Sequence, residues 1–137
     1  MIDLSLMDKK ALAKVFDYSV LPKETQEAAI RKGCVLTRQY QFAAFYSSSP
    51  FWAPIVKEEL ADFPDIEIGT GISFPWGSVP ASVKALETEE AVKLGCTAVD
   101  ICIHFDNLYF GIEAFLEDSC ENCIGSRIAQ RASFNAQ

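Results

Sequence analysis

The chain has 137 residues, which predicts a single domain, and half of them are hydrophobic, which is enough apolar surface for a core. Its formal net charge of −7 argues against general nucleic-acid binding, because such binding needs cations that neutralise phosphates. The N-terminus lacks the basic start and apolar run of a signal peptide, and no apolar stretch reaches the ~18 residues of a membrane span. We therefore expect a cytoplasmic protein without nucleic-acid or membrane partners.

The first half of the chain predicts two helices and two extended segments. Ser5 to Asp8 fits a capping box, in which a hydroxyl caps a helix and an acid three residues later reaches back. The helix is expected to end near Val15. Residues 16–21 then form a short extended segment, residues 24–38 a second helix, and residues 42–47 a strand with little polarity on either face.

The second half repeats the alternation. Ser49 and Pro50 mark a helix start, and that helix is expected to continue to Leu60. Residues 66–73 and 98–103 are predicted strands, and residues 81–94 a long helix stopped by a left-handed Gly95. In that helix we expect Val83, Leu86, Ala91 and Leu94 to face inward and Lys84, Glu87, Glu89, Glu90 and Lys93 to face outward. Residues 112–118 are predicted as a short helix.

Strands that are apolar on both faces and alternate with amphipathic helices indicate a parallel sheet covered by helices. The fold class is therefore α/β, an incomplete (β/α)8 TIM-barrel fragment with about three parallel strands, since a full barrel usually needs about 250 residues. The third strand is expected at an open edge, which invites pairing with another chain. We place a boundary near Ser119, so that residues 1–119 form the barrel part and residues 120–137 a weakly patterned tail.

Two acids are the candidate catalytic residues. Asp100 lies inside an otherwise apolar strand, and a buried carboxylate costs several kcal/mol unless it has a partner or a function. Asp100 and Cys102 should share one face of that strand. Asp17 lies in a similar setting, and two acids across a barrel mouth can divide the roles of general acid and base. An acid that caps a loop amide remains the simpler alternative for each.

Three further features carry weaker signals. His104, the only histidine, follows a strand end, where barrel chemistry collects, although an exposed loop histidine is the preferred interpretation. Residues 74–77 (FPWG) form a rigid turn that could wall a ligand site or simply bury its aromatic side chains. Cys34, Cys96 and Cys102 are expected as buried reduced thiols.

The tail holds one CxxC pair, Cys120 and Cys123. A structural zinc site needs four ligands, so we expect no metal. A redox or metal protein built on this pair stays open as a minor alternative.

Together these segments resemble the deoxyribose-phosphate aldolase family. The resemblance covers roughly residues 9 to 118 and is carried by residues 16–22 (FDYSVLP), 42–52, 71–77 (GISFPWG) and 90–100 (EAVKLGCTAVD). It implies a class I aldolase on a TIM barrel, which cleaves 2-deoxyribose 5-phosphate to acetaldehyde and glyceraldehyde 3-phosphate through a lysine Schiff base. No metal or organic cofactor is implied.

The resemblance also assigns roles to residues. Asp100 matches the acid that relays protons near the Schiff base, Asp17 an early acid of the site, and Ser19 a neighbouring hydroxyl. Tyr46 stands nearest to the family's cysteine on an early strand, and His104 occupies the position of an asparagine or similar residue. The implied substrate is a small phosphorylated sugar or aldehyde, and Ser19, Tyr46 and His104 are the expected contacts with it.

The family's Schiff-base lysine and phosphate loops lie on later strands, which this sequence does not contain. We therefore expect a chain truncated before that lysine and inactive by itself. The alternative is a non-catalytic half-barrel that binds a ligand or another subunit. In either case, a homo-oligomer or pairing through the open sheet edge is the expected mode of association.

Overall fold

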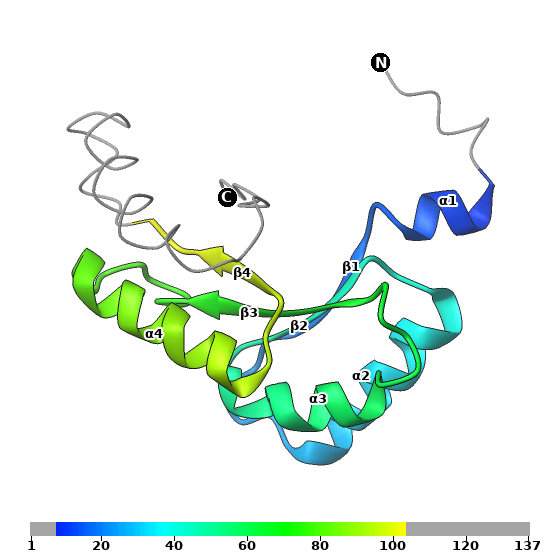
Figure 1. The fold of residues 1–137 in the computed structure, drawn as a ribbon, viewed down its shortest axis with the longest axis horizontal. Helices are drawn as coiled ribbons and strands as arrows, with labels where there is room; N and C mark the ends of the chain where they lie inside the picture. Colours follow the sequence, from blue (N-terminus) through cyan, green and yellow to red (C-terminus); the bar gives the residue numbers. More distant parts are fainter. Residues whose placement is uncertain (1–7, 104–137) are drawn as a thin grey trace.

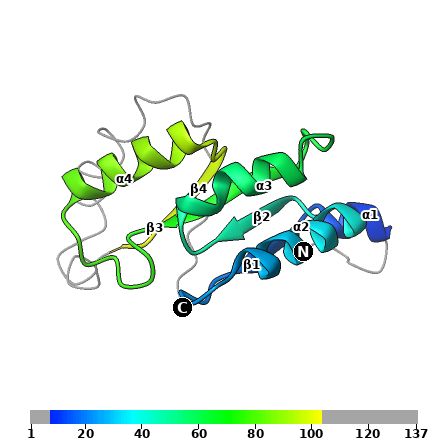
Figure 2. The same ribbon diagram turned by 90° about the horizontal axis from the view of Figure 1, so that it is seen from below.

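The structure is a computed structural model that describes residues 8–103. Four strands, β1 (Asp17–Val20), β2 (Ala44–Ser47), β3 (Glu67–Ile72) and β4 (Ala98–Ile101), form one parallel sheet in the order β1-β2-β3-β4. Figures 1 and 2 show α2 (Glu27–Tyr40), α3 (Ala53–Glu59) and α4 (Ala81–Leu94) on the same side of this sheet. The α/β class with parallel strands covered by helices is confirmed.

The sheet has four strands where the sequence predicted about three. The additional strand is β1, for which the sequence predicts only a short extended segment. Its backbone pairs with β2: the Ala43 amide donates to the Phe16 carbonyl at 2.9 Å, and the Ser48 amide donates to the Val20 carbonyl at 3.2 Å. A four-residue segment with an acid and a serine has a weak strand pattern, so pairing with β2 decides its structure.

The helix boundaries follow local capping. In α1 (Lys9–Ala13), Asp8 is the N-cap and accepts a hydrogen bond from the Ala11 amide. The predicted cap, Ser5, lies outside the described residues. Ser49 caps the short 3-10 helix η2 (Pro50–Trp52), which leads into α3. As predicted, α4 ends at a left-handed Gly95 with φ 108°.

The helical face predicted for α4 is wrong in part. Lys84 is 3% exposed, whereas Val83 and Leu86 are 43% and 62% exposed. Lys84 lies inward because its Nζ donates to the Cys102 carbonyl at 2.8 Å, which satisfies the ammonium at the end of β4. Ala91 is buried and Lys93 exposed, as expected.

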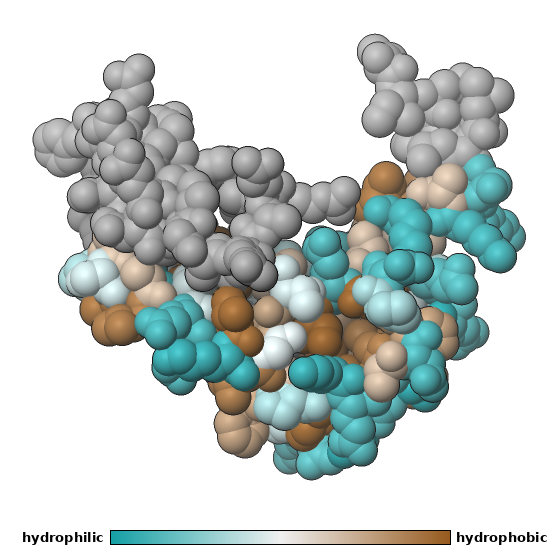
Figure 3. Space-filling view, viewed as in Figure 1, coloured by the Kyte–Doolittle hydropathy of each residue, from teal (hydrophilic) through white to brown (hydrophobic). Residues whose placement is uncertain are grey.

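The core lies between the helices and the sheet, and its residues come from every helix that covers the sheet. It contains Ile30, Cys34, Phe45, Ala53, Val56, Leu60, Ile66, Ile68, Ile72, Ala91 and Cys96. Figure 3 shows hydrophilic residues over much of the visible surface, interrupted by separate hydrophobic patches. None of the helices described is long and apolar enough to span a membrane.

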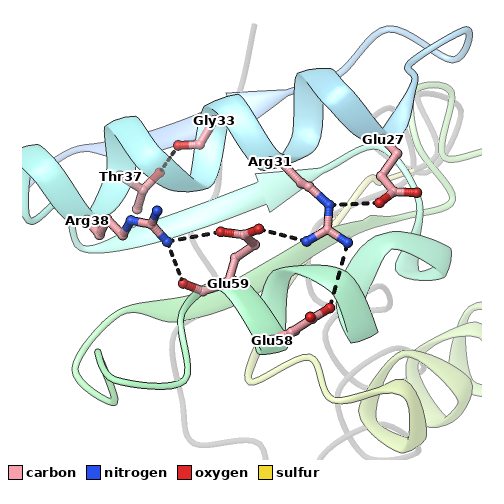
Figure 4. A network of polar contacts seen from close by, with 7 residues as sticks. All are labelled: Glu27, Arg31, Gly33, Thr37, Arg38, Glu58 and Glu59. Carbon is pink, nitrogen blue, oxygen red and sulfur yellow. Dashed lines mark hydrogen bonds and ion pairs between the residues drawn. The ribbon is translucent and has the colours of Figure 1, made fainter.

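An ion-pair network joins α2 to α3 (Figure 4). The carboxylate of Glu59 accepts from Arg31 at 2.7 Å and from Arg38 at 2.9 Å, and Arg31 also binds Glu27 at 2.7 Å. The hydrogen bond from Arg31, followed by that from Arg38, lowers the pKa of Glu59 below its ordinary value of 4.5. Glu59 therefore connects the two helices with a charge that the folded state holds at mildly acidic pH.

We expect Glu59→Gln to lower the free energy of unfolding at neutral pH by about 0.5–1 kcal/mol, because it weakens two ion pairs. Since the folded pKa of Glu59 lies below the unfolded one, its contribution is present above about pH 4.5 and is lost as the pH falls through the folded value. Urea unfolding between neutral and acidic pH measures the difference. Glu58→Gln is the control, because Glu58 is 71% exposed and 3.7 Å from Arg31. An equal loss in both variants would contradict the prediction.

Candidate functional site

The described candidate residues, Asp17, Ser19, Tyr46 and Asp100, lie on the face of the sheet that is turned away from the helices. The strand register places Ser19 beside Tyr46, Tyr46 beside Gly69 and Gly69 beside Ala98. Because side chains alternate along a strand, residues two positions apart share a face. This inner face therefore carries Asp17, Ser19, Ala44, Tyr46, Glu67, Gly69, Gly71, Ala98 and Asp100. The opposite face supplies Phe45, Ile68 and Ile72 to the helical core.

Tyr46 occupies the middle of the inner face. It is 8% exposed and forms a small cluster with Ala44 and Ala98. Its ring lies against Gly69, where an added Cβ would overlap the ring atoms. Small residues on three strands therefore create the space that the phenol ring fills.

The Tyr46 hydroxyl donates a hydrogen bond to the Asp100 carboxylate. Burial is the largest cause that raises the pKa of Tyr46 above its ordinary value of 10, followed by the negative charges of Asp100 and Asp17. The phenol therefore stays protonated at neutral pH, close to two carboxylates. A hydroxyl between two acids on an inner sheet face can hold and pass protons.

The register sets the levels of the two acids. Asp17 begins β1 in the row of Ala44, whereas Asp100 lies in the row of Gly71, four residues further along the strands. Tyr46 lies in the row between them and is influenced by both charges. The inner face thus brings Asp17, Ser19, Tyr46 and Asp100 together. His104 and the Cys120–Cys123 pair lie outside the described residues.

The end of β4 is held by contacts that the sequence analysis missed. Gly77, with φ 65°, packs so closely on the Ile103 carbonyl that an added Cβ would overlap it. The Glu87 carboxylate accepts from the Ser73 amide at 2.8 Å, which fixes the start of the same turn. Trp76 in this turn is 73% exposed, so the expectation that the turn buries its aromatic side chains is wrong for Trp76. Gly77, the glycine that ends the turn, was the available sequence signal for this close packing.

The cysteines of the described region are not suited to nucleophilic catalysis. Cys34 and Cys96 are buried free thiols, as predicted, and Cys102 is half-buried. Burial is the main cause that raises the pKa of Cys34 to about 12 and that of Cys96 to about 11. Such thiols carry almost no thiolate at neutral pH. Within residues 8–103, no group of three or more His, Cys, Asp and Glu side chains is arranged to hold a metal ion.

We expect Gly69→Ala to destabilise the protein by about 1–3 kcal/mol, because the new methyl group forces the Tyr46 ring to move. In a Tyr46→Ala background the same substitution should cost little, since the ring is gone. Chemical unfolding of the four variants of this cycle measures the coupling.

Gly71→Ala is the matched control for this cycle, because its Cβ would meet Phe74 at 2.8 Å rather than Tyr46. Its cost should therefore be the same with or without Tyr46. Equal costs of Gly69→Ala in both backgrounds would show that the ring does not fill the space over Gly69.

We expect Asp100→Asn to lower the pKa of Tyr46, because the variant removes the nearest negative charge and the hydrogen-bond acceptor that favours the neutral phenol. A tyrosinate absorbance titration, with Tyr46→Phe subtracted to isolate this residue, measures the shift. Asp65→Asn, in the turn before β3, is the matched control and should leave the titration unchanged. An unaltered pKa in Asp100→Asn would place the two side chains apart.

Comparison with known proteins places the chain among aldolases by sequence, although no family model matches it. It is 34% identical over 99 residues to the deoxyribose-phosphate aldolase of Halalkalibacterium halodurans, covering 72% of this chain and 44% of the relative. The enzyme of Bacillus mycoides is 33% identical over 106 residues, covering 77% of this chain and 47% of the relative. The chain thus spans about half the length of the curated relatives it matches.

Solved structures support the same fold. The tetrameric deoxyribose-phosphate aldolase of Aeropyrum pernix superposes with a TM-score of 0.65 at 20% identity, over 85% of this chain and 50% of the other. An aldolase designated QR15 gives a TM-score of 0.71 at 19% identity, over 84% of this chain and 50% of the other. At these identities the superpositions establish a partial TIM-barrel fold.

Proposed function

Because the chain belongs to the deoxyribose-phosphate aldolase family, we propose that its inner sheet face supplies the proton-transfer part of an aldolase site. Asp100 and Asp17 are the proposed catalytic acids, and Ser19, Tyr46 and His104 the proposed substrate contacts. The observation that carries this proposal is the hydrogen bond from the buried Tyr46 phenol to the Asp100 carboxylate. The proposed reaction of the completed site is cleavage of 2-deoxyribose 5-phosphate through a lysine Schiff base.

The chemistry of that reaction explains why acids are needed. An amine that attacks a carbonyl gives a carbinolamine, which must gain and lose protons before it can dehydrate to the Schiff base. A carboxylate that is held near the reacting carbon can take up a proton and return it at each step. Asp100 is suited to this role because Tyr46 orients its carboxylate inside the sheet face.

The reacting amine is not among the residues of the inner face, none of which is a lysine. Lys84 is buried, but its Nζ is bound to the Cys102 carbonyl at 2.8 Å from the helical side. Lys93 is exposed and paired with Glu89 and Glu90 at 2.9 and 2.8 Å. We therefore propose that this chain alone forms no Schiff base and is inactive as an aldolase.

A non-catalytic half-barrel that binds a ligand or another subunit is the second candidate function. The observation that favours it is the same lack of a lysine on the inner face, which leaves hydroxyl and carboxylate groups able to bind a sugar but not to react covalently. Both candidate functions predict that no covalent adduct forms on this chain. They differ in whether an added amine restores cleavage of 2-deoxyribose 5-phosphate.

Borohydride trapping with acetaldehyde tests the proposal. We expect no change in the mass of this chain at neutral pH, while the Halalkalibacterium halodurans relative serves as the positive control. Lys84→Arg separates specific from adventitious labelling of the buried amine. A stable adduct on wild type that disappears in Lys84→Arg would overturn the proposed inactivity and assign the amine to Lys84.

Restoring chemistry with small primary amines tests the acids separately. We expect slow cleavage of 2-deoxyribose 5-phosphate when such an amine is added to wild-type protein, and at least a tenfold slower rate in Asp100→Asn, within the usual contribution of a general acid or base. Cleavage at the rate of the free amine in both proteins would favour the non-catalytic half-barrel.

A further inference from the structure

The two outer strands of the sheet are incompletely buried. All four residues of β2 are buried, as are four of the six in β3. In contrast, no residue of β1 is buried and only the first residue of β4 is. The helix-facing apolar side chains Tyr18 and Val20 on β1, and Val99 and Ile101 on β4, are only partly buried at the margin of the core.

Both outer strands, β1 and β4, have backbone amides and carbonyls that face away from the sheet. The carbonyls of Phe16 and Val20 face β2, so the alternate residue Ser19 directs its amide and carbonyl away from β2. The Cys102 amide donates to the Ile72 carbonyl of β3, so the alternate residue Ile101 directs its own backbone groups away from β3. Among the described residues, neither of these edges has a neighbouring strand. Open edges of this kind are templates for pairing with another chain.

The two edges are complementary to each other. All four strands run in the same direction, and α2, α3 and α4 cover the same face (Figure 1). If β4 of one copy lies beside β1 of a second copy, the new pair is parallel, and the helices of both copies stay outside. A two-fold axis repeats this contact at the other pair of edges, so that β1 and β4 of each copy are both paired.

We propose that two copies of this chain close one eight-stranded parallel barrel, with β4 of each beside β1 of the other. Eight is the number of strands at which a parallel sheet covered by helices closes with a filled interior. The described residues of each copy provide four strands, and the chain spans 50% of the aldolase from Aeropyrum pernix that it resembles. The described residues of two copies therefore supply the required number of strands and pair both edges.

A second copy fits these edges better than a complete aldolase chain does. A complete TIM barrel has no open edge, so it offers no strand to β1 or β4. The interior of the closed dimer would hold two Tyr46–Asp100 pairs, one from each copy.

The first test is the mass of the wild-type chain in solution at micromolar concentration, measured by light scattering after gel filtration. We expect twice the chain mass of 15.2 kDa. A monomer with intact helical circular dichroism would overturn the proposal, and so would open-ended larger assemblies, because those edges would not have closed. The readout is assembly, so it stands or fails independently of the proposed aldolase chemistry.

A matched pair of substitutions locates the contact. Phe16 directly precedes β1 and is 53% exposed, whereas Phe51 in η2 is 69% exposed and lies after the central strand β2. We expect Phe16→Lys to weaken dimerisation at least tenfold and Phe51→Lys to leave it unchanged. Equal effects of the two substitutions, or a larger effect of Phe51→Lys, would place the dimer contact elsewhere and contradict the proposal.

Hydrogen exchange gives a readout that does not depend on any variant. In the closed barrel the amides of Ser19 and Ile101 are hydrogen-bonded across the new contacts, so their exchange should slow at least tenfold as the protein concentration rises through the dimerisation range. The Phe45 amide, in the central strand β2, should change much less. A dimer in which Ser19 and Ile101 exchange as fast as in the monomer would use another surface and would overturn the proposal.

Discussion

The fold depends on the burial of Phe45 between the sheet and α2. Phe45 has no exposed surface, and a Cβ at Gly33 of α2 would lie 2.6 Å from its ring. This close contact sets the distance between helix and sheet and fixes which face of β2 the helices cover. Because side chains alternate along a strand, burying Phe45 on one face sends Tyr46 to the other. The position of the phenol is thus a consequence of the helical core.

The same alternation of side chains between the two faces determines which residues of β3 lie on the inner face. Ile68 and Ile72 of β3 join the helical core, so the residues between them that share the face of Tyr46 can be glycines. Gly69 leaves room for the Tyr46 ring, and the hydroxyl then reaches Asp100 two strands away. The acid that was unexpected inside an apolar strand has its partner on β2. The packing of the Tyr46 ring and its hydrogen bond to Asp100 therefore depend on Gly69, the small residue on β3 between β2 and β4.

Much of the architecture could be read from residue patterns. Apolar strands alternating with helices predicted the parallel sheet, Ser49 and Gly95 marked helix boundaries, and Cys34 and Cys96 were expected to be buried. The pattern failed for Lys84, because a lysine next to apolar residues reads as a surface residue unless a buried acceptor such as the Cys102 carbonyl is known. It also failed to identify β1 as a strand, since pairing with β2 rather than local preference determines it.

The sequence by itself determined the class of fold and the identity of the two unusual acids, because periodicity and a charge within an apolar strand are local properties. Only the tertiary structure decided that Asp17, Tyr46 and Asp100 share a face, that Glu59 links α2 to α3, and that both outer strands are incompletely buried. These features depend on strand register and on contacts between segments far apart in the chain. Local residue patterns carry no information about either, since both arise when the sheet assembles.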